Sequence, residues 1–216
     1  MQRSLLITEI YKSVQGEAAY AGWPCSFVRL TGCPLRCRWC DTVYGFKGGQ
    51  RMTFEQIFAE LDRLAVPLIE LTGGEPLAQE GTVELISELI QHGYKVMIET
   101  SGSESIAQLH PATHIIMDLK CPGSGMEDRN LYQNLFHLKA TDEIKFVIAD
   151  RSDFEWARDL ITRESLDSRF AVLFSAAFGL LQPQQLVEWM LEEGLVRVRL
   201  NLQQHKYIWN PRAKGV

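Results

Sequence analysis

The chain has 216 residues, of which 46% are hydrophobic and 23% are charged, a balance typical of a folded globular protein with a sizeable core. Its net charge of −5 argues against direct nucleic-acid binding, which would need a basic surface. No apolar run reaches the roughly 18 residues of a transmembrane helix, and the first residues do not resemble a secretory signal. We therefore expect no membrane contact and a cytoplasmic location.

In chain order, short apolar segments alternate with segments of helical periodicity. The predicted strands cover residues 27–30, 68–71, 96–98, 115–117, 144–148, 171–174 and 196–200. The predicted helices cover residues 53–64, 83–93, 152–163 and 183–193. Thr53 with Gln56, and Ser152 with Glu155, have the spacing of capping boxes, in which side chains satisfy the free N–H groups of a helix start.

This alternation predicts an α/β fold built from βαβ units around a parallel sheet. Periodicity alone does not decide between an open sheet and a barrel, although the chain is short for the eight units of a full TIM barrel. In either form, functional side chains are expected at the carboxyl ends of the strands.

Five cysteines are present, and three of them lie within eight residues, at Cys33, Cys37 and Cys40. An odd number with this crowding does not suit a disulfide framework and indicates metal-binding thiolates in a reducing compartment. Three thiolates can each bind one iron of a cubane cluster and leave the fourth iron open to a ligand. The alternative is a structural zinc site, which would more often show a second CxxC pair. Cys25 and Cys121 are expected to be buried non-ligands.

A second motif, Thr72-Gly73-Gly74-Glu75-Pro76, follows the second predicted strand. Glycines at a strand end allow the backbone to approach a ligand closely. Polar residues also close later strands, and these are Ser101, Asp118, Lys120 and Ser175.

Together, the CxxxCxxC spacing with Trp39 as its aromatic residue and the Gly-Gly-Glu-Pro turn resemble the radical S-adenosylmethionine (SAM) superfamily. The resemblance implies a [4Fe–4S] cluster on the three cysteines, with SAM chelated to the open iron and cleaved to a 5′-deoxyadenosyl radical. It implies SAM contacts from Trp39, Cys40, Asp41, Gly73, Gly74 and Glu75. In a barrel whose strand ends surround one ligand, the strand-end residues Ser101, Asp118, Lys120 and Ser175 become candidate SAM contacts, although such residues are more often helix caps or surface groups.

Further segments resemble one family within that superfamily, the 7-carboxy-7-deazaguanine synthases. They are the QGE loop, RLTGCPLRCRWCDT, IETSG, DLKCP and the tail LQQHKYIW. This resemblance implies a lyase that converts 6-carboxy-5,6,7,8-tetrahydropterin to 7-carboxy-7-deazaguanine, by radical ring contraction with loss of ammonia, on the route to queuosine in tRNA. It also implies Mg²⁺, a homodimer, an electron donor such as a flavodoxin or ferredoxin, and an incomplete TIM-like barrel of parallel strands with outer helices.

Carried over by position, the resemblance implies a single domain over residues 1–216 with a substrate loop at 13–18, a cluster loop at 33–40 and a closing tail at 202–216. Thr42 is the expected Mg²⁺ ligand. The expected substrate contacts are Val14, Gln15, Gly16, Glu17, Arg29, Thr72 and Val216. No residue is assigned to general acid–base catalysis. The family commonly has glycine where this chain has Ala18, and an activase acting on a partner protein is the alternative enzyme class.

Overall fold

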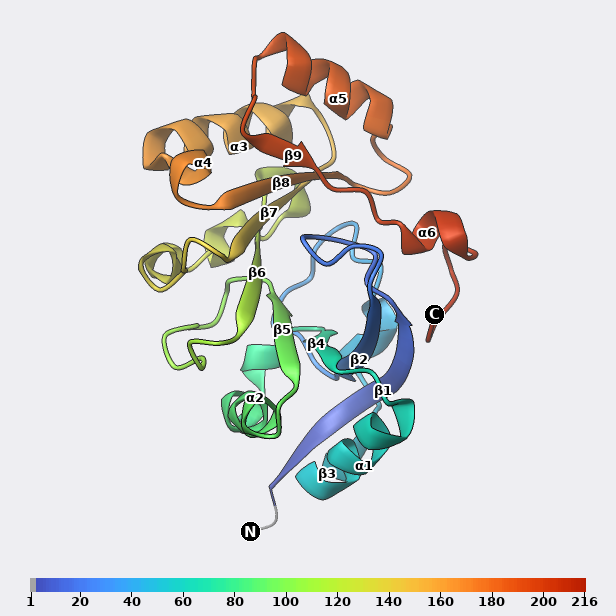
Figure 1. Ribbon diagram of the computed structural model, residues 1–216. Coiled ribbons are helices and arrows are strands. Elements are labelled where there is room, and N and C mark those ends of the chain that lie inside the picture. Colours follow the sequence, from blue (N-terminus) through green and yellow to red (C-terminus); the bar gives the residue numbers. More distant parts are fainter. Residues whose placement is uncertain (1–2) are drawn as a thin grey trace.

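The computed structural model describes residues 3–216 and contains a nine-stranded sheet that curls into an incomplete barrel (Figure 1). The strand order is β3-β1-β2-β4-β5-β6-β7-β8-β9. Neighbouring strands are parallel from β2 to β9, whereas β1 runs antiparallel to both β2 and β3. The strands are β1 (Ser4–Val14), β2 (Pro24–Leu30), β3 (Gln50–Thr53), β4 (Leu68–Gly73), β5 (Lys95–Thr100), β6 (His114–Leu119), β7 (Glu143–Ile148), β8 (Ala171–Ala176) and β9 (Val198–Leu200). The predicted fold class is confirmed.

The seven predicted strands are all present, but the sequence analysis missed β1 and β3. In β1 a bulge between Ile7 and Glu9 changes which residues face each side of the sheet. Leu5 and Ile7 therefore pack with Ile10 on the outer side, while Tyr11 faces the inner side. A bulge breaks the simple alternation by which a strand is recognised, and β3 is too short to show any period.

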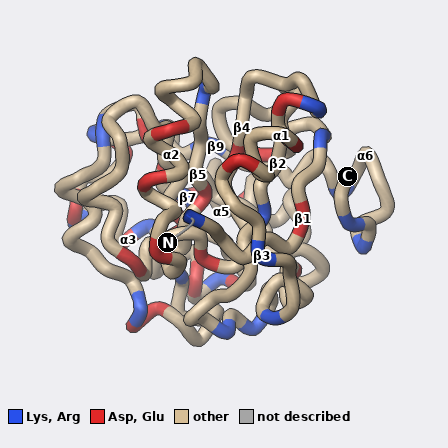
Figure 2. Tube along the Cα trace, turned by 90° about the horizontal axis from the view of Figure 1, so that it is seen from below, with Lys and Arg blue, Asp and Glu red and all other residues tan. Residues whose placement is uncertain are grey.

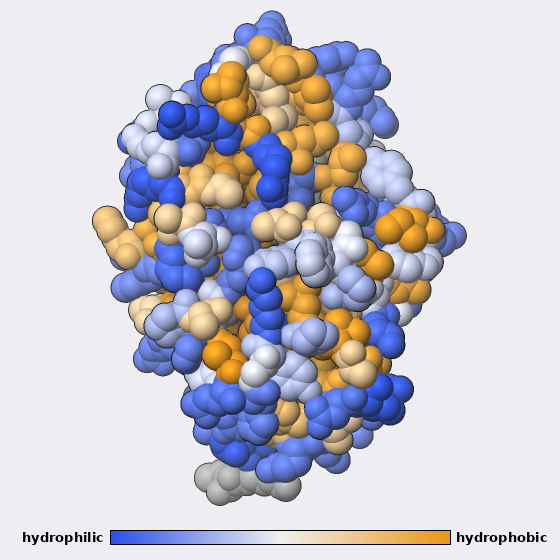
Figure 3. Space-filling model, viewed as in Figure 1, coloured by the Kyte–Doolittle hydropathy of each residue, from blue (hydrophilic) through white to orange (hydrophobic). Residues whose placement is uncertain are grey.

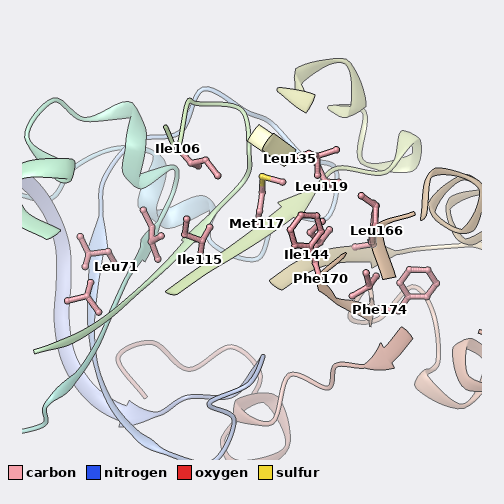
Figure 4. Close-up of a cluster of buried hydrophobic side chains, with 14 of the residues drawn as sticks. Leu71, Ile106, Ile115, Met117, Leu119, Leu135, Ile144, Leu166, Phe170 and Phe174 are labelled. Carbon is pink, nitrogen blue, oxygen red and sulfur yellow. The ribbon is translucent and has the colours of Figure 1, made fainter. Parts of the chain in front are cut away.

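Helices cover the outer face of the sheet. They are α1 (Phe54–Leu64), α2 (Thr82–Gln91), α3 (Arg151–Glu164), α4 (Leu166–Arg169) and α5 (Pro183–Glu192), while a sixth helix, α6 (His205–Ile208), belongs to the C-terminal tail. Figure 1 shows α1 to α5 along the outside of the curved sheet, with α6 apart from them beside the β1–β2 hairpin. The main hydrophobic core fills the space between these outer helices and the strands, as Figure 4 shows for Leu71, Ile115, Ile144 and Phe174.

The helix starts confirm one predicted cap and correct the other. Thr53 caps α1 in a capping box with Gln56, as predicted. The capping box of Ser152 with Glu155 is wrong, because α3 is capped by Asp150, whose side chain accepts a hydrogen bond from the N–H of Asp153 at 3.0 Å. A carboxylate cap supplies the same acceptor two residues earlier and also favours the positive end of the helix dipole.

The inner face of the sheet is more polar than the outer face. A small apolar cluster that includes Phe27, Met97, Ile116 and Leu173 fills part of it. The remaining inward positions on neighbouring strands are polar or charged, and they define the candidate site below. None of the helices within residues 3–216 is long and apolar enough to cross a membrane.

The end of α1 provides a test of the backbone geometry. Ala65 follows the helix with φ of 56° and its side chain is exposed, so a residue other than glycine is strained there. We expect Ala65→Gly to raise the free energy of unfolding by about 0.5–1 kcal/mol. The same change at exposed Ala59, inside α1, should lower it by about 1 kcal/mol. Chemical denaturation of both variants measures the two changes in the free energy of unfolding. Changes in the same direction would contradict the left-handed conformation of Ala65.

Candidate active site

The cluster loop follows β2 and is braced from two sides. Cys33, Cys37 and Cys40 are half-buried free thiols on this loop. The Arg36 guanidinium donates to the backbone oxygen of Cys33 at 2.7 Å, and the N–H of Arg38 donates to the oxygen of Ser124 at 3.1 Å. These contacts fix a loop that has no regular secondary structure of its own.

The three thiols suit a cluster better than a single ion. Within residues 3–216, no three His, Cys, Asp or Glu side chains are grouped so that they could hold one metal ion. A cubane cluster does not require the three thiols to converge on one point, because each thiolate binds a different iron atom. Burial raises the pKa of Cys33, Cys37 and Cys40, and the Lys120 ammonium opposes that rise at all three. The donor chemistry therefore fits a [4Fe–4S] cluster.

The Gly-Gly turn at the end of β4 lies directly against the base of the cluster loop. A Cβ atom on Gly73 would lie 2.2 Å from the backbone oxygen of Leu30, and one on Gly74 would lie 2.0 Å from that of Gly32. The N–H of Glu75 donates to the oxygen of Gly32 at 2.9 Å. The two glycines are therefore required for the backbones of β2 and β4 to meet here.

Glu75 stabilises this turn through its buried side chain. Its carboxylate accepts hydrogen bonds from the N–H of Leu77 at 3.0 Å, from the Thr100 hydroxyl at 2.9 Å, and from the N–H and hydroxyl of Ser101 at 2.7 and 2.5 Å. Burial raises the pKa of Glu75, and these hydrogen bonds oppose the rise. The side chains of Glu75 and Ser101, both predicted to contact SAM, are thus bonded to each other.

The other predicted strand-end residues differ in whether they have a hydrogen-bonding atom that the protein leaves unpaired. Lys120 Nζ lies 2.9 Å from Asp118 Oδ2, while the buried Asp118 Oδ1 has no hydrogen-bond partner within the described chain. An unpaired buried carboxylate oxygen is costly, so this atom is suited to accept a bond from a ligand. The hydroxyl of Ser175, in contrast, both donates to and accepts from Asn201.

The predicted substrate loop begins where β1 ends at Val14 and turns into the barrel. The Gln15 amide donates to the buried Glu70 carboxylate. Glu17 accepts from Lys145 at 3.1 Å, from Asn201 at 2.9 Å and from the tail residue Gln203 at 3.0 Å. Burial opposes ionisation of Glu17, but Lys145 and Gln203 outweigh it and lower its pKa.

Ala18 adopts the left-handed backbone conformation, with φ of 62°, which glycine adopts more easily. Its N–H donates to the Asn201 side-chain oxygen at 2.8 Å, and the next N–H, of Ala19, donates to Glu143 at 2.9 Å. These hydrogen bonds connect the loop to β7 and to the segment that follows β9.

Arg29 lies on β2 and faces the inner side. Its Nε donates to Glu9 at 2.8 Å and its Nη2 donates to the Tyr11 hydroxyl at 3.0 Å, while the Tyr44 hydroxyl donates to the same Glu9 oxygen at 2.8 Å. The guanidinium has five donors. These two hydrogen bonds fix its plane and leave N–H groups for an anionic ligand.

The sequence analysis assigned no site role to three charged residues on the inner face, which are Glu70, Glu99 and Lys145. Lys145 contacts Glu99, whose other oxygen is 3.5 Å from the hydroxyl of the predicted substrate residue Thr72. Burial and the neighbouring carboxylates raise the pKa of Glu70 well above its usual range. The overlooked signal was a charge inside an otherwise apolar strand, because such a residue is almost never buried without a partner.

The tail crosses the open side of the barrel and contacts both loops. The N–H of Gln204 donates to the oxygen of Gly16 at 2.9 Å, and Lys206 Nζ lies 2.7 Å from Asp41 Oδ2. The other oxygen of Asp41 accepts from the Thr42 hydroxyl at 3.0 Å. Figure 2 shows the basic positions of the tail in blue beside the C-terminus.

The last residues of the tail lie beside Tyr44 and Glu9, which are neighbours of Arg29. Lys214 Nζ is 4.2 Å from the centroid of the Tyr44 ring, and Gly215 lies beside the Glu9 carboxylate. The apolar residues Tyr207 and Ile208 are 65% and 54% exposed, so polar contacts contribute most to holding the tail.

Three comparisons place this arrangement among known proteins. Residues 27–118 match the model of the Radical SAM superfamily. A 7-carboxy-7-deazaguanine synthase of Koribacter versatilis is 48% identical over 97% of this chain and 99% of that protein, and one of Chlorobaculum tepidum is 43% identical over 98% and 97%. The crystal structure of QueE from Escherichia coli shares the fold, with a TM-score of 0.76 at 24% identity over 94% of this chain and 95% of that one.

The Gly-Gly turn can be tested by adding one methyl group. Gly74→Ala places a Cβ 2.0 Å from the Gly32 oxygen, so we expect a loss of about 3 kcal/mol in the free energy of unfolding and a lower iron content. Gly93→Ala is the control, because its Cβ would meet nothing within 4 Å although φ is +88°. Denaturation and iron analysis of both variants measure the difference. A Gly74→Ala protein with full iron content would contradict this account.

The tail contact can be tested at its ion pair. Partial desolvation opposes ionisation of Asp41, but Lys206 and Thr42 lower its pKa to about 2, so the pair is present at neutral pH and is lost as the pH falls towards that value. We expect Lys206→Met to weaken tail docking by about 1 kcal/mol or less, since Asp41 is 54% exposed. Hydrogen exchange of residues 203–209 should accelerate. Arg212→Met, which removes an exposed tail charge, should leave that exchange unchanged.

Proposed function

The chain belongs to the 7-carboxy-7-deazaguanine synthase family of radical SAM enzymes, and from this we propose that it converts 6-carboxy-5,6,7,8-tetrahydropterin to 7-carboxy-7-deazaguanine. As a radical SAM enzyme it uses a [4Fe–4S] cluster and SAM. The observation that carries the substrate proposal is the convergence of four segments on the inner face. These are the cluster loop, the Gly-Gly turn, the QGE loop and the tail.

The cluster and SAM side of the site is formed by the first two of these segments. Cys33, Cys37 and Cys40 would hold the cluster, and bound SAM supplies the radical that removes a hydrogen atom from the substrate. We propose that Gly73 and Gly74 give SAM close access to the backbone. The free Asp118 Oδ1 is the best placed of the predicted contacts to accept a hydrogen bond from SAM. The proposal retains the other predicted SAM contacts, which are Trp39, Cys40, Asp41, Glu75, Ser101, Lys120 and Ser175.

The substrate side is formed by the QGE loop, β2 and the tail. Arg29 would bind the pterin carboxylate with the N–H groups that Glu9 and Tyr11 leave free. Thr42 would offer its hydroxyl to Mg²⁺, which prefers oxygen ligands and keeps several waters. The proposal also retains Val14, Gln15, Gly16, Glu17, Thr72 and Val216 as residues that border the substrate.

The proposal also covers the domain organisation, cellular location, electron donor and oligomeric state of the enzyme. We propose one domain over residues 1–216, acting in the cytoplasm, where thiolates stay reduced and a flavodoxin or ferredoxin can donate electrons. Exposed Leu180, Leu191 and Val196 support a homodimer, and Figure 3 shows the apolar surface over α5 at the top of that view. Exposed apolar patches of this kind mark protein contacts.

Anaerobic turnover tests the function directly. Reduced enzyme with SAM, Mg²⁺ and the carboxytetrahydropterin should yield the deazaguanine acid, detected by mass spectrometry, and should contain about four irons per chain. SAM cleavage without that acid would keep the radical SAM chemistry and reject the substrate, as an activase would behave. A protein with one zinc and no iron would reject both.

Arg29 gives the most specific test of the substrate assignment. We expect Arg29→Ala to raise KM for the pterin about tenfold or more, because a charge-assisted bidentate contact is lost, with iron content unchanged. Glu9→Gln is the matched control, because it breaks the same ion pair but keeps the guanidinium. Steady-state kinetics and iron analysis separate the two. Equal KM values in both variants would show that Arg29 acts only through its partner.

A further inference from the structure

Lys145 is a buried cation in the centre of the inner face. It lies in the middle of β7, and its side chain is 5% exposed. Its Nζ is 3.1 Å from Glu17 Oε2 and also contacts Glu99 Oε1. One ammonium thus joins the QGE loop to β5, two segments that approach the proposed substrate position from different sides.

The charge balance around Lys145 depends on both carboxylates. Burial alone would lower its pKa, but Glu17 and Glu99, together with nearby Asp118, raise it well above the usual value. The same ammonium helps to keep Glu17 ionised. Glu70 lies against these groups, and its raised pKa favours the uncharged acid. Lys145 is therefore a cation placed between the carboxylates of Glu17 and Glu99.

The two carboxylates differ in how much of their bonding capacity remains. Glu17 accepts hydrogen bonds at both oxygens, because Asn201 and Gln203 donate to it in addition to Lys145. Glu99 accepts from Lys145 at Oε1 and makes only a long hydrogen bond at Oε2, where the Thr72 hydroxyl donates at 3.5 Å, and its side chain is 25% exposed. One oxygen of Glu99 is fixed by Lys145 and the other faces the site.

We propose that Lys145 is a positioning residue for the substrate, because it orients Glu99 as a hydrogen-bond acceptor and locks the QGE loop through Glu17. This inference rests on the proposed function. The pyrimidine edge of a pterin presents amino and amide N–H donors, and an oriented carboxylate is the complementary acceptor. Lys145 would act through Glu99 and Glu17 and would not itself touch the pterin.

The alternative is that Lys145 only stabilises the fold. Removing one partner of a buried ion pair is destabilising whatever the function of the site. Lys139 offers a matched control, because its Nζ lies 2.8 Å from Asp142 Oδ2, a fully buried carboxylate in the loop that precedes β7. That pair belongs to the opposite end of the strands from the cluster loop.

The test compares Lys145→Ala and Lys139→Ala in the reconstituted holoenzyme, each with and without ethylammonium, which can replace the missing amine. We expect Lys145→Ala to raise KM for the pterin about ten- to a hundredfold, with a smaller change in kcat, because hydrogen bonds to a charged group lose their orientation. Ethylammonium should restore KM. Lys139→Ala should leave KM unchanged whether or not its melting temperature falls.

Two further readouts keep the inference falsifiable. Hydrogen exchange of residues 15–19 should accelerate in Lys145→Ala and not in Lys139→Ala. If Lys145→Ala does not fold, Lys145→Arg replaces it, and its KM for the pterin should remain close to the wild-type value. A melting temperature restored by ethylammonium with unchanged KM would reduce Lys145 to a structural role and overturn the inference. If wild-type enzyme makes no deazaguanine acid, the proposed function fails instead, and the exchange measurement still decides whether Lys145 locks the loop.

Discussion

The close approach of β4 to β2 at the Gly-Gly turn is the constraint on which the site depends. Any side chain at Gly74 would overlap the backbone of Gly32, and Gly32 is the residue that leads into Cys33. The cluster loop is therefore placed by backbone contact with the turn. Glu75 then fixes the turn to the end of β5 through its buried hydrogen bonds. The positions of three strand ends follow from one contact that only glycine permits.

A second constraint comes from the sheet being open. Its edge strands are β3 and β9, so within residues 3–216 no strand pairing joins β9 to the β1–β2 hairpin. Side chains bridge that opening, chiefly at Asn201, which bonds to Glu17, Ala18 and Ser175. The tail adds further contacts at Gly16 and Asp41. The site is thus closed by individual polar contacts, and each of these opens at a lower cost than a strand pair.

The sequence predicted the parallel strands, the outer helices and the cysteine loop because each has a strong local signal. Apolar runs, a 3.6-residue period and thiol spacing can be read without knowing what lies nearby in space. β1 escaped prediction because its bulge changes the facing of the chain after Ile7. Lys145 and Glu70 were not predicted as site residues, because their role depends on side chains that other strands bring next to them. The exposed Tyr207 and Ile208 show that apolar content indicates burial only when a partner surface exists.

The inner face also explains why its charged residues must be considered in pairs. Arg29 with Glu9, Lys120 with Asp118, Lys145 with Glu17 and Glu99, and Lys206 with Asp41 all place a cation against a carboxylate. An unpaired charge here would be expensive to bury, so the pairs make a polar interior possible. They also orient each group before a ligand arrives, and binding then costs less ordering. The ligand can use only the donors and acceptors that the pairs leave free, notably on Arg29, Glu99 and Asp118. Those remaining groups, more than the charges themselves, determine which small molecule the barrel accepts.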